Sequence, residues 1–442
     1  MNMWRGLIHK RLIHKTVSFK FRGMDLNFDL SQELFSSADI DSGTRFLLKV
    51  FSKKIDAITQ TQTDQLPGTI LDAGCGIGVI GICTAAAIDA MGGGEGLLVN
   101  CHDRDELARL FTLHNAAKNN ISPAVLKAYT CPLLAEETLG FGYDMILSNI
   151  PAKAGHPVLE DFFCRSLKLL NPEGLVIIVA VNTLYNFCVK NIEQCGAEIF
   201  LEEKSPGHTV FVFGFCEKNK ITQSRLPSEH RNRESGFLAK YPFYFRSKAV
   251  YEMEGQIVSL ETLHGAPGFD KPGGSVLAAA KLARRIDNYN STPSLLVFEP
   301  EQGFFPCWLL KYLKGVKLLV LSGRNILALE ASKHNVLQKD ETKELPVHFI
   351  PAVDLSLGCE ALLSVTNGRK FDIIAAFPQK LHKKDDFSTI WDALPSLLAD
   401  KGILLAAFSS TDALRFHQKK PSGFTSLGSV KKNGFRALAY LK

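Results

Sequence analysis

The fold is decided by one stretch, Thr69-Ile70-Leu71-Asp72-Ala73-Gly74-Cys75-Gly76-Ile77-Gly78-Val79-Ile80-Gly81. An apolar run ends at Asp72, glycines recur at alternate positions, and an apolar helical pattern begins at Val79. This order predicts a strand, a tight turn and a helix start. Gly74, Gly76 and Gly78 let the backbone turn sharply and let a ligand approach where a β-carbon would block it. The free N–H groups of the helix start favour a negatively charged ligand group, so the stretch predicts a nucleotide-binding turn.

The spacing of the glycines narrows the choice of nucleotide. The P-loop pattern G-x-x-x-x-G-K-[ST] is absent. An acidic residue two positions before G-x-G-x-G resembles motif I of the class I S-adenosylmethionine (SAM) dependent methyltransferases. The resemblance implies that Asp72, Gly74, Gly76 and Gly78 bind SAM as methyl donor. A plain strand-to-helix connection remains the alternative.

Length and composition indicate the class of protein. A chain of 442 residues is long enough for two or three domains, and 46% apolar with 22% charged residues is typical of a soluble globular protein. The net charge of +6 favours a polyanionic partner only mildly. The ten cysteines form no C-x-x-C pair and stand mostly in apolar runs. We therefore expect reduced core cysteines in a cytosolic protein.

The sequence also indicates which other sites to expect. No group of His, Cys, Asp and Glu has metal-ligand spacing, so we predict no metal. The longest uncharged run, residues 73–88, is too short and too rich in glycine to span a bilayer. The basic N-terminus lacks an apolar core with a cleavage site, and we expect the protein to stay in the cytoplasm without membrane contact.

A segment before the glycine turn makes the resemblance more specific. Residues 34–48 contain Phe35-Ser36, then Asp41-Ser42-Gly43-Thr44, then Leu47-Leu48, and they predict a polar turn that feeds an amphipathic helix to about residue 58. The segment resembles the one that precedes motif I in the "methyltransferase small" family of ribosomal RNA guanine-N2 methyltransferases. There the order is phenylalanine-serine, aspartate-x-glycine-threonine, then leucines.

Two further cofactor contacts follow from the resemblance. Residues 97–103 predict a second strand ending at Asp103, whose carboxylate would accept both ribose hydroxyls of SAM. The alternative role for Asp103 is the N-cap of the helix expected at 106–118. The third strand ends near Thr130, where many relatives carry an aspartate that holds the adenine amino group. Thr130 or a backbone group is the expected substitute.

The predicted catalytic loop is Asn149-Ile150-Pro151-Ala152, at the exit of a strand that begins at Tyr143. Amino-methyltransferases carry Asn-Pro-Pro-aromatic there. An exocyclic amine conjugated into a base is a poor nucleophile, so its N–H bonds must be accepted and its lone pair held in line with the methyl group. The side-chain oxygen of Asn149 and the carbonyl of Ile150 can accept them, Asn149 also contacts SAM, and Pro151 stiffens the loop. A plain turn is the alternative.

The second half of the chain repeats the first. Asp372 falls 228 residues after Asp144, and Gly402 falls 228 residues after Gly174. Three changes that we take as independent remove the chemistry of this copy: residues 299–303 replace the glycine turn, Gly323 replaces Asp103, and Ala376 replaces Asn149. The resemblance therefore implies two Rossmann-like class I methyltransferase domains in tandem, each a mostly parallel seven-stranded sheet flanked by helices.

The expected domains are a catalytic SAM-binding domain at 1–216, a basic and aromatic linker at 217–245, and a degenerate methyltransferase-like domain at 246–442. Residues 1–30 form a basic arm with the leading strands of the first domain. The resemblance implies methylation of guanine N2 in ribosomal RNA, with the base splayed into the site. The basic arm and linker are solvated chain or RNA contacts. Two alternatives remain open: a methyltransferase of a protein amide or small molecule, and a non-catalytic RNA-binding scaffold.

Overall fold

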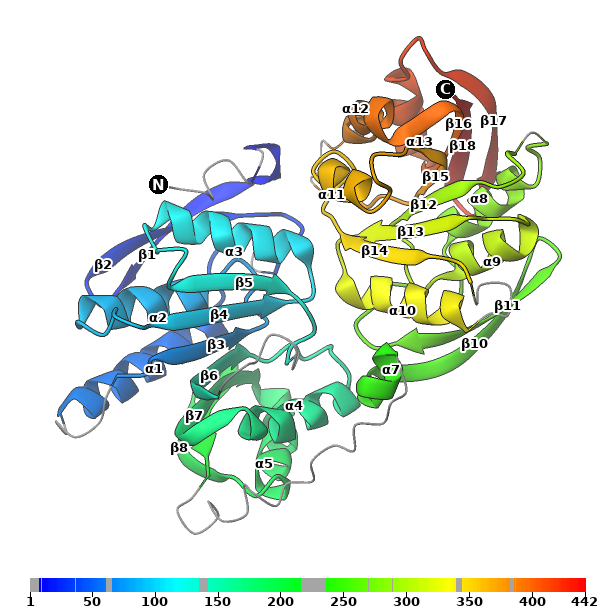
Figure 1. Cartoon of the computed structure of the whole chain (residues 1–442). Helices are drawn as coiled ribbons and strands as arrows, with labels where there is room; N and C mark the ends of the chain where they lie inside the picture. Colours follow the sequence, from blue (N-terminus) through cyan, green and yellow to red (C-terminus); the bar gives the residue numbers. More distant parts are fainter. Residues whose placement is uncertain are drawn as a thin grey trace. The chain divides into compact units, whose positions relative to one another are not determined.

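The computed structural model divides the chain into two compact units, Met1–Arg233 and Glu234–Lys442. The structure describes residues 8, 10–35, 37–60, 66–134, 142–215, 236–268, 270–287, 289–338, 344–381, 385 and 387–442. Each unit contains a large sheet with helices packed against it (Figure 1). The division falls inside the expected linker, whose residues 217–235 lie outside the described ranges. The precise limits of the linker stay a prediction.

The first unit contains a two-stranded hairpin followed by a seven-stranded sheet. Its elements are η1 (Lys10–Leu12), β1 (Lys15–Phe21), β2 (Met24–Leu30), α1 (Ser42–Gln60), β3 (Thr69–Ala73), α2 (Val79–Ala90), β4 (Leu98–Asp103), α3 (Glu106–Lys118), β5 (Leu126–Thr130), β6 (Tyr143–Asn149), α4 (His156–Lys168), β7 (Leu170–Val181), η3 (Asn182–Leu184), α5 (Tyr185–Gln194), β8 (Glu198–Lys204) and β9 (His208–Gly214). The strand order is β5-β4-β3-β6-β7-β9-β8, and only β9 runs antiparallel to its neighbours.

The strand order places the site. The chain leaves β3 for β4 on one side and later returns to β6 on the other, so the direction of winding reverses between β3 and β6. Open parallel sheets bind ligands outside the carboxyl ends of the strands at such a reversal. The two predicted motifs end those two strands: Asp72-Ala73 ends β3, and Asn149 ends β6.

The second unit has the same architecture (Figure 1). Its elements are α7 (Phe237–Lys240), η5 (Pro242–Tyr244), β10 (Phe245–Met253), β11 (Gln256–Leu263), α8 (Gly274–Ala283), β12 (Ser294–Phe298), α9 (Phe304–Tyr312), β13 (Leu318–Gly323), α10 (Ile326–Leu337), β14 (Val347–Pro351), α11 (Cys359–Ser364), β15 (Phe371–Ala376), α12 (Ser388–Leu397), β16 (Leu398–Ser409), α13 (Ser410–Gln418), β17 (Thr425–Lys432) and β18 (Phe435–Leu441). The strand order β14-β13-β12-β15-β16-β18-β17 matches the first unit strand for strand. The predicted fold class is confirmed.

The leading strands expected within residues 1–30 form a hairpin. Residues 15–29 alternate as a single strand would, but β1 and β2 pair with each other around a turn at Arg22 and Gly23, whose φ angles are 49° and 83°. Glycine adopts this left-handed region without steric cost, so Gly23 permits a tight turn in a polar stretch. Alternation continues across the turn, and periodicity alone therefore missed it.

A buried asparagine fastens each hairpin to its unit. Asn115 on α3 donates to the carbonyls of Asp29 and Ile77 at 3.1 and 3.0 Å, and accepts the Asp29 N–H at 2.8 Å. Asn335 on α10 makes the same three bonds in the second unit, with Glu261 and Gln302. The preceding histidines repeat as well, since His114 pairs with Asp29 and His334 with Glu261.

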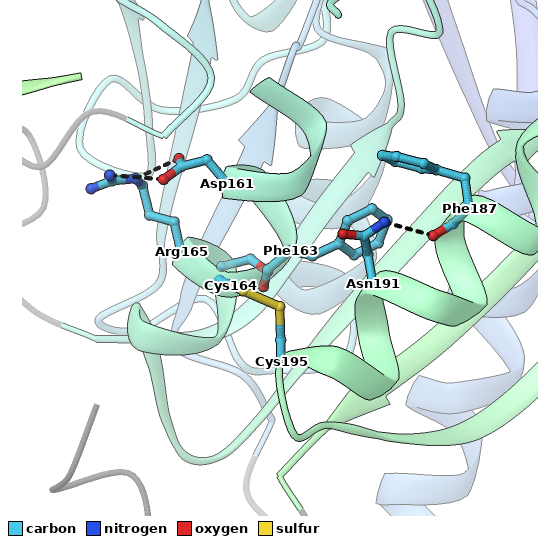
Figure 2. Close-up of a disulfide and its surroundings, with 8 residues drawn as sticks. Asp161, Phe163, Cys164, Arg165, Phe187, Asn191 and Cys195 are labelled. Atoms are coloured by element: carbon cyan, nitrogen blue, oxygen red, sulfur yellow. Dashed lines mark hydrogen bonds and ion pairs between the residues drawn. A yellow bond between two sulfur atoms is a disulfide. The ribbon is translucent and has the colours of Figure 1, made fainter. Parts of the chain in front are cut away.

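A disulfide corrects the expectation of reduced cysteines. Cys164 on α4 is bonded to Cys195 at the end of α5, with 5.2 Å between their Cα atoms (Figure 2). The two helices pack against each other, with Phe163 against Phe187, and this brings together residues 31 positions apart in sequence. No spacing rule could have paired them. Among the described residues, the other seven cysteines are free, and all except Cys359 are buried.

The asparagine contacts predict a local loss of stability. Asn115→Ala should leave buried backbone groups of the hairpin without partners and cost about 2–3 kcal/mol. Hydrogen exchange on the whole chain should then quicken in β1 and β2 and leave β10 and β11 unchanged. Asn335→Ala is the matched variant, with the opposite pattern. Equal exchange in both hairpins for either variant would contradict the role assigned to these side chains.

Candidate functional site

The glycine turn has three left-handed residues in alternation. The φ angles of Gly74, Gly76 and Gly78 are 84°, 56° and 87°. The N–H groups of Gly74 and Cys75 both donate to the carbonyl of His102 on β4, at 2.8 and 2.9 Å, so the loop folds back onto the neighbouring strand. This geometry explains the alternate spacing, because left-handed backbone favours glycine.

Two of these glycines have different neighbours. A β-carbon at Gly78 would stand 2.9 Å from a Thr112 side-chain atom and 3.1 Å from its Cα, so packing against α3 requires glycine there. A β-carbon at Gly76 would meet nothing within 4 Å. The α-carbon of Gly76 therefore faces open space at the carboxyl end of β3, where a ligand can approach the backbone.

Asp72 lies beneath the loop. It is fully buried, and its Oδ2 accepts the Gly81 N–H of α2 at 2.9 Å. Its Oδ1 has no hydrogen-bond partner among the described residues. Burial raises the pKa of Asp72 to about 7, and the nearby Asp103 carboxylate adds to the rise. The carboxyl thus anchors the loop to the first turn of α2 from inside the protein.

Asp103 lies on the outer side of the same loop. Its Oδ2 accepts the Gly76 N–H at 3.0 Å and its Oδ1 accepts the Asp105 N–H at 3.0 Å. Burial, followed by repulsion from Asp105, raises its pKa to about 6. The alternative N-cap role is wrong, because the α3 cap is Asp105, whose side chain accepts the Leu107 N–H.

A residue that the sequence analysis missed adjoins Thr130. The Thr130 hydroxyl donates to the carboxylate of Glu106, which also binds Arg109 through both of its oxygens. Thr130 pairs directly with Asp103 across β4 and β5, so the two predicted residues lie next to each other. Glu106 follows Asp103 by three residues, and an acidic side chain in the first turn of α3 was the available signal.

The loop after β6 begins with Asn149, whose side-chain oxygen is available as a hydrogen-bond acceptor. The Asn149 side-chain nitrogen donates to Asp41 Oδ2 and to Thr44 Oγ1, each at 3.0 Å. Its Oδ1 receives no hydrogen bond from any described residue. The Ile150 N–H donates to the Val179 carbonyl at 2.9 Å and the Ala154 N–H to the Pro151 carbonyl at 2.8 Å. The loop is therefore a fixed turn that leaves an acceptor at the carboxyl end of β6.

The second unit keeps the turn and replaces its glycines. Glu299, Glu301 and Gly303 have φ angles of 57°, 53° and 98°, the same alternation as in the first unit. Glu299 Oε1 accepts the Arg324 N–H at 2.9 Å, and a β-carbon at Gly323 would stand 3.2 Å from the Glu299 carboxyl carbon. The glutamate on one strand end thus occupies the space beside the glycine on the next. The residues at 299 and 323 are therefore in contact, whereas the independence of the three changes stays a prediction.

Other predicted surfaces lie partly outside the described ranges. Arg5 and the basic residues from Lys218 to Arg233 are among the residues without a described placement. At the end of the expected linker, Tyr241 and Tyr244 are buried and pack against Phe237. Within the part of the chain that the structure describes, no helix could cross a membrane and no group of His, Cys, Asp and Glu could hold a metal ion.

Comparison with known proteins finds relatives of the first unit. Residues 25–195 match the family model of the methyltransferase small domain. The chain is 26% identical over 197 residues to the uncharacterized protein YbxB of Bacillus subtilis (strain 168), covering 44% of this chain and 89% of that protein. It is 30% identical over 164 residues to the ribosomal RNA small subunit methyltransferase C of Actinobacillus pleuropneumoniae serotype 3 (strain JL03). That match covers 36% of this chain and less than half, 44%, of the relative.

A solved structure shares the fold of the whole chain. It is the T. thermophilus 16S rRNA N2 G1207 methyltransferase (RsmC) in complex with AdoMet and guanosine. The match covers 98% of this chain and 100% of that chain with a TM-score of 0.57. The sequence identity is 14%, so this likeness establishes the two-domain fold alone.

The two raised carboxyl pKa values predict how stability changes with pH. Asp72 and Asp103 hold protons in the folded state to about pH 7 and about pH 6, whereas unfolded aspartates lose them near 4. The folded state binds more protons in between, so the stability that these two carboxyls contribute is fully present below about pH 4 and falls as pH rises to about 7. Asp72→Asn should flatten this slope, as read from urea midpoints at pH 5 and pH 8. An unchanged slope would mean that Asp72 is ionised throughout.

Proposed function

We propose, from the match of residues 25–195 to the family model of the methyltransferase small domain, that the chain transfers a methyl group from SAM to an exocyclic amine of an RNA base. The base that we propose is guanine, methylated at N2 in ribosomal RNA. The observation that carries the proposal is the acceptor oxygen of Asn149 at the end of β6, beside the glycine turn that ends β3.

The residues present fit a bound SAM. The open face of Gly76 leaves room for a ligand, and the carboxylate of Asp103, which loses its proton near pH 6, gives the turn a negative potential. SAM supplies a methyl group activated by a positively charged sulfonium, and that charge is attracted by such a potential. Asp103, Gly74 and Gly76 would hold the cofactor, whereas Asp72 is buried and would act by anchoring the loop.

The loop after β6 would bind the amine that accepts the methyl group. The Oδ1 of Asn149 and the Ile150 carbonyl accept the two N–H bonds of the incoming amine and direct its lone pair outward. As the nitrogen gains positive charge during transfer, those N–H groups become stronger donors, so acceptors fixed in advance stabilise the transition state more than the ground state. Both acceptors stand on an element that is bonded to β7 and to α1.

The second unit would support substrate binding without binding SAM. The Glu301 side chain lies against the residues that precede α8. A β-carbon on Gly268 would stand 2.9 Å from Glu301 Oε2. Glu299 and Glu301 therefore occupy the side of the turn that is open in the first unit. The repeated contacts of Asn115 and Asn335 support an origin by duplication, as does the way that Asp144 and Asp372 each accept the N–H of the residue that starts the neighbouring strand.

A ribosomal RNA substrate would place the protein in the cytoplasm, with its basic arm and the basic stretch at 217–233 as phosphate contacts. Labelled-methyl transfer to ribosomal RNA stripped of protein, to free nucleosides and to protein tests the substrate class. Transfer to RNA supports the proposal. Transfer only to protein or nucleosides would replace the acceptor, and no transfer to any of them would favour a binding role.

Gly76 variants test the cofactor site. Gly76→Ala puts a methyl group into the open space and should weaken SAM binding at least tenfold in calorimetry. An alanine in left-handed backbone also costs about 1–2 kcal/mol of stability, whether or not a ligand binds there. Gly92→Ala is the matched control, because Gly92 also has a positive φ of 82° and nothing within 4 Å of its β-carbon, but stands in the turn after α2. Equal SAM affinities in both variants would remove Gly76 from the site.

Asn149→Ala tests the acceptor site. The variant loses an oxygen that receives an N–H bond as charge develops, so single-turnover transfer should slow by about a hundredfold or more. The SAM dissociation constant should change little. Asn27→Ala is a control for amide removal, since the Asn27 side chain is bonded only to Ser18 on the exposed hairpin. Near-normal transfer by Asn149→Ala would make the loop a simple turn.

A further inference from the structure

The orientation of the Asn149 amide is imposed by its neighbours. Its nitrogen lies 3.0 Å from Asp41 Oδ2 and 3.0 Å from Thr44 Oγ1. An ionised carboxylate only accepts hydrogen bonds, so the atom of Asn149 that faces Asp41 must be the NH₂ group. The oxygen is then turned the other way, toward the open end of β6. A rotation of the amide by half a turn would put two acceptors together and present a donor where the amine must bind.

The neighbours are themselves fixed. Asp41 directly precedes α1, and its Oδ2 also accepts the N–H groups of Gly43 and Thr44 at 2.9 and 3.2 Å. Its position is therefore set by the start of a helix that packs on β6, β7 and β9. Gly43 allows the close fit, because a β-carbon there would stand 2.9 Å from Asp41 Oδ2 and 3.0 Å from the His208 ring. The Asp-x-Gly-Thr pattern thus fixes two acceptors, on Asp41 and Thr44, that hold the Asn149 amide; we call this pair the holder.

The second unit shows that the fold does not need this holder. Its helix α8 occupies the place of α1 and begins after Gly273, with no side-chain cap. Val276 stands where Thr44 stands, three residues after the cap, and Ala376 ends β15 as Asn149 ends β6. All three hydrogen-bonding side chains are missing together, yet the helix and the sheet form. Their joint presence in the first unit therefore serves something other than folding.

We propose that Asp41 and Thr44 are positioning residues that hold Asn149 with its oxygen toward the acceptor amine. The inference rests on the proposed methyltransferase function and adds two residues to it. Neither side chain touches the reacting atoms, because both are bonded to the nitrogen end of the amide. They act by keeping the acceptor in one orientation before the substrate arrives, which lowers the cost of reaching the transition state.

Thr44 gives the simpler test. Thr44→Val keeps the shape and removes the hydroxyl, so one of the two bonds that hold the amide is lost. We expect kcat for methyl transfer to fall about tenfold, with unchanged SAM affinity and a small change in KM for RNA. Thr44→Ser restores the hydroxyl and should restore kcat to within about twofold of the wild type. Equal loss in both variants would indicate a packing defect and overturn the positioning role.

The variant Asn149→Asp provides a second test, the pH dependence of the transfer rate, which a purely structural role of Asp41 would not change. In Asn149→Asp, two carboxyls stand about 3 Å apart and share one proton, because like charges at that distance disfavour double ionisation. The protonated pair mimics the native one, with an O–H donating to Asp41 and a carbonyl oxygen facing the amine. Its transfer rate should fall as pH rises and the pair loses its proton, beyond any pH dependence of the wild type.

The double variant Asp41→Asn/Asn149→Asp leaves one carboxyl at this place, so no proton is shared between two carboxyls. Asparagine caps helices as well as aspartate does. Its rate should follow the pH profile of the wild type. Other charged or titratable side chains lie close to this helix start: His208 lies beside Gly43, Arg45 is paired with Asp39, and Lys15 donates to the Ala38 carbonyl. These groups are unchanged in all three proteins, so the wild-type profile accounts for their titration.

The outcomes separate the inference from the function on which it depends. If the wild type transfers no methyl group to RNA, the proposed function fails and the variants are not informative about it. If the wild type is active and Asn149→Asp shows the wild-type pH profile, Asp41 does not face residue 149 and the positioning role is overturned. A pH-dependent Asn149→Asp that the double variant rescues supports it.

Discussion

The left-handed turn at the end of β3 is the constraint on which the site depends. Residues 74, 76 and 78 take positive φ so that the chain can fold back onto the His102 carbonyl and still start α2 within one turn. The second unit adopts the same alternation with glutamates at two of the three positions. Each non-glycine residue in that conformation costs about 1–2 kcal/mol, so the surrounding sheet, not the glycine content, dictates the backbone path.

The two turns, after β3 and after β12, show two different reasons for a glycine at a given position. At Gly78 and Gly303 a β-carbon would collide with the backbone of the next helix, at Thr112 or Ser332, and glycine remains in both units. At Gly76 a β-carbon meets no protein atom, and the second unit has Glu301 there. The first pair is retained for packing. The open space at Gly76 agrees with the proposed cofactor site in the first unit only.

Much of the architecture followed from pattern. Helix α3 runs over the predicted residues 106–118, because its apolar spacing, acidic start and basic end agree. The arrangement of the site was harder to predict from the sequence. Asp41 and Thr44 were predicted as a helix start, but only the packing of α1 against β6 shows that they hold Asn149. The Cys164–Cys195 disulfide and the packing of Glu299 against Gly323 depend on contacts between elements, which no local spacing encodes. The Asp105 cap is local, because its side chain accepts the Leu107 N–H two residues on.

The central claim is that one chain carries one cofactor site, and that it lies in the first unit. Equilibrium dialysis of the whole chain with radiolabelled SAM, followed by photochemical crosslinking and peptide mapping, tests it most directly. We predict one SAM per chain, with the crosslink in peptides that contain residues 72–78 or 103. Two equivalents per chain, or a crosslink in peptides that contain residues 299–303, would contradict the account.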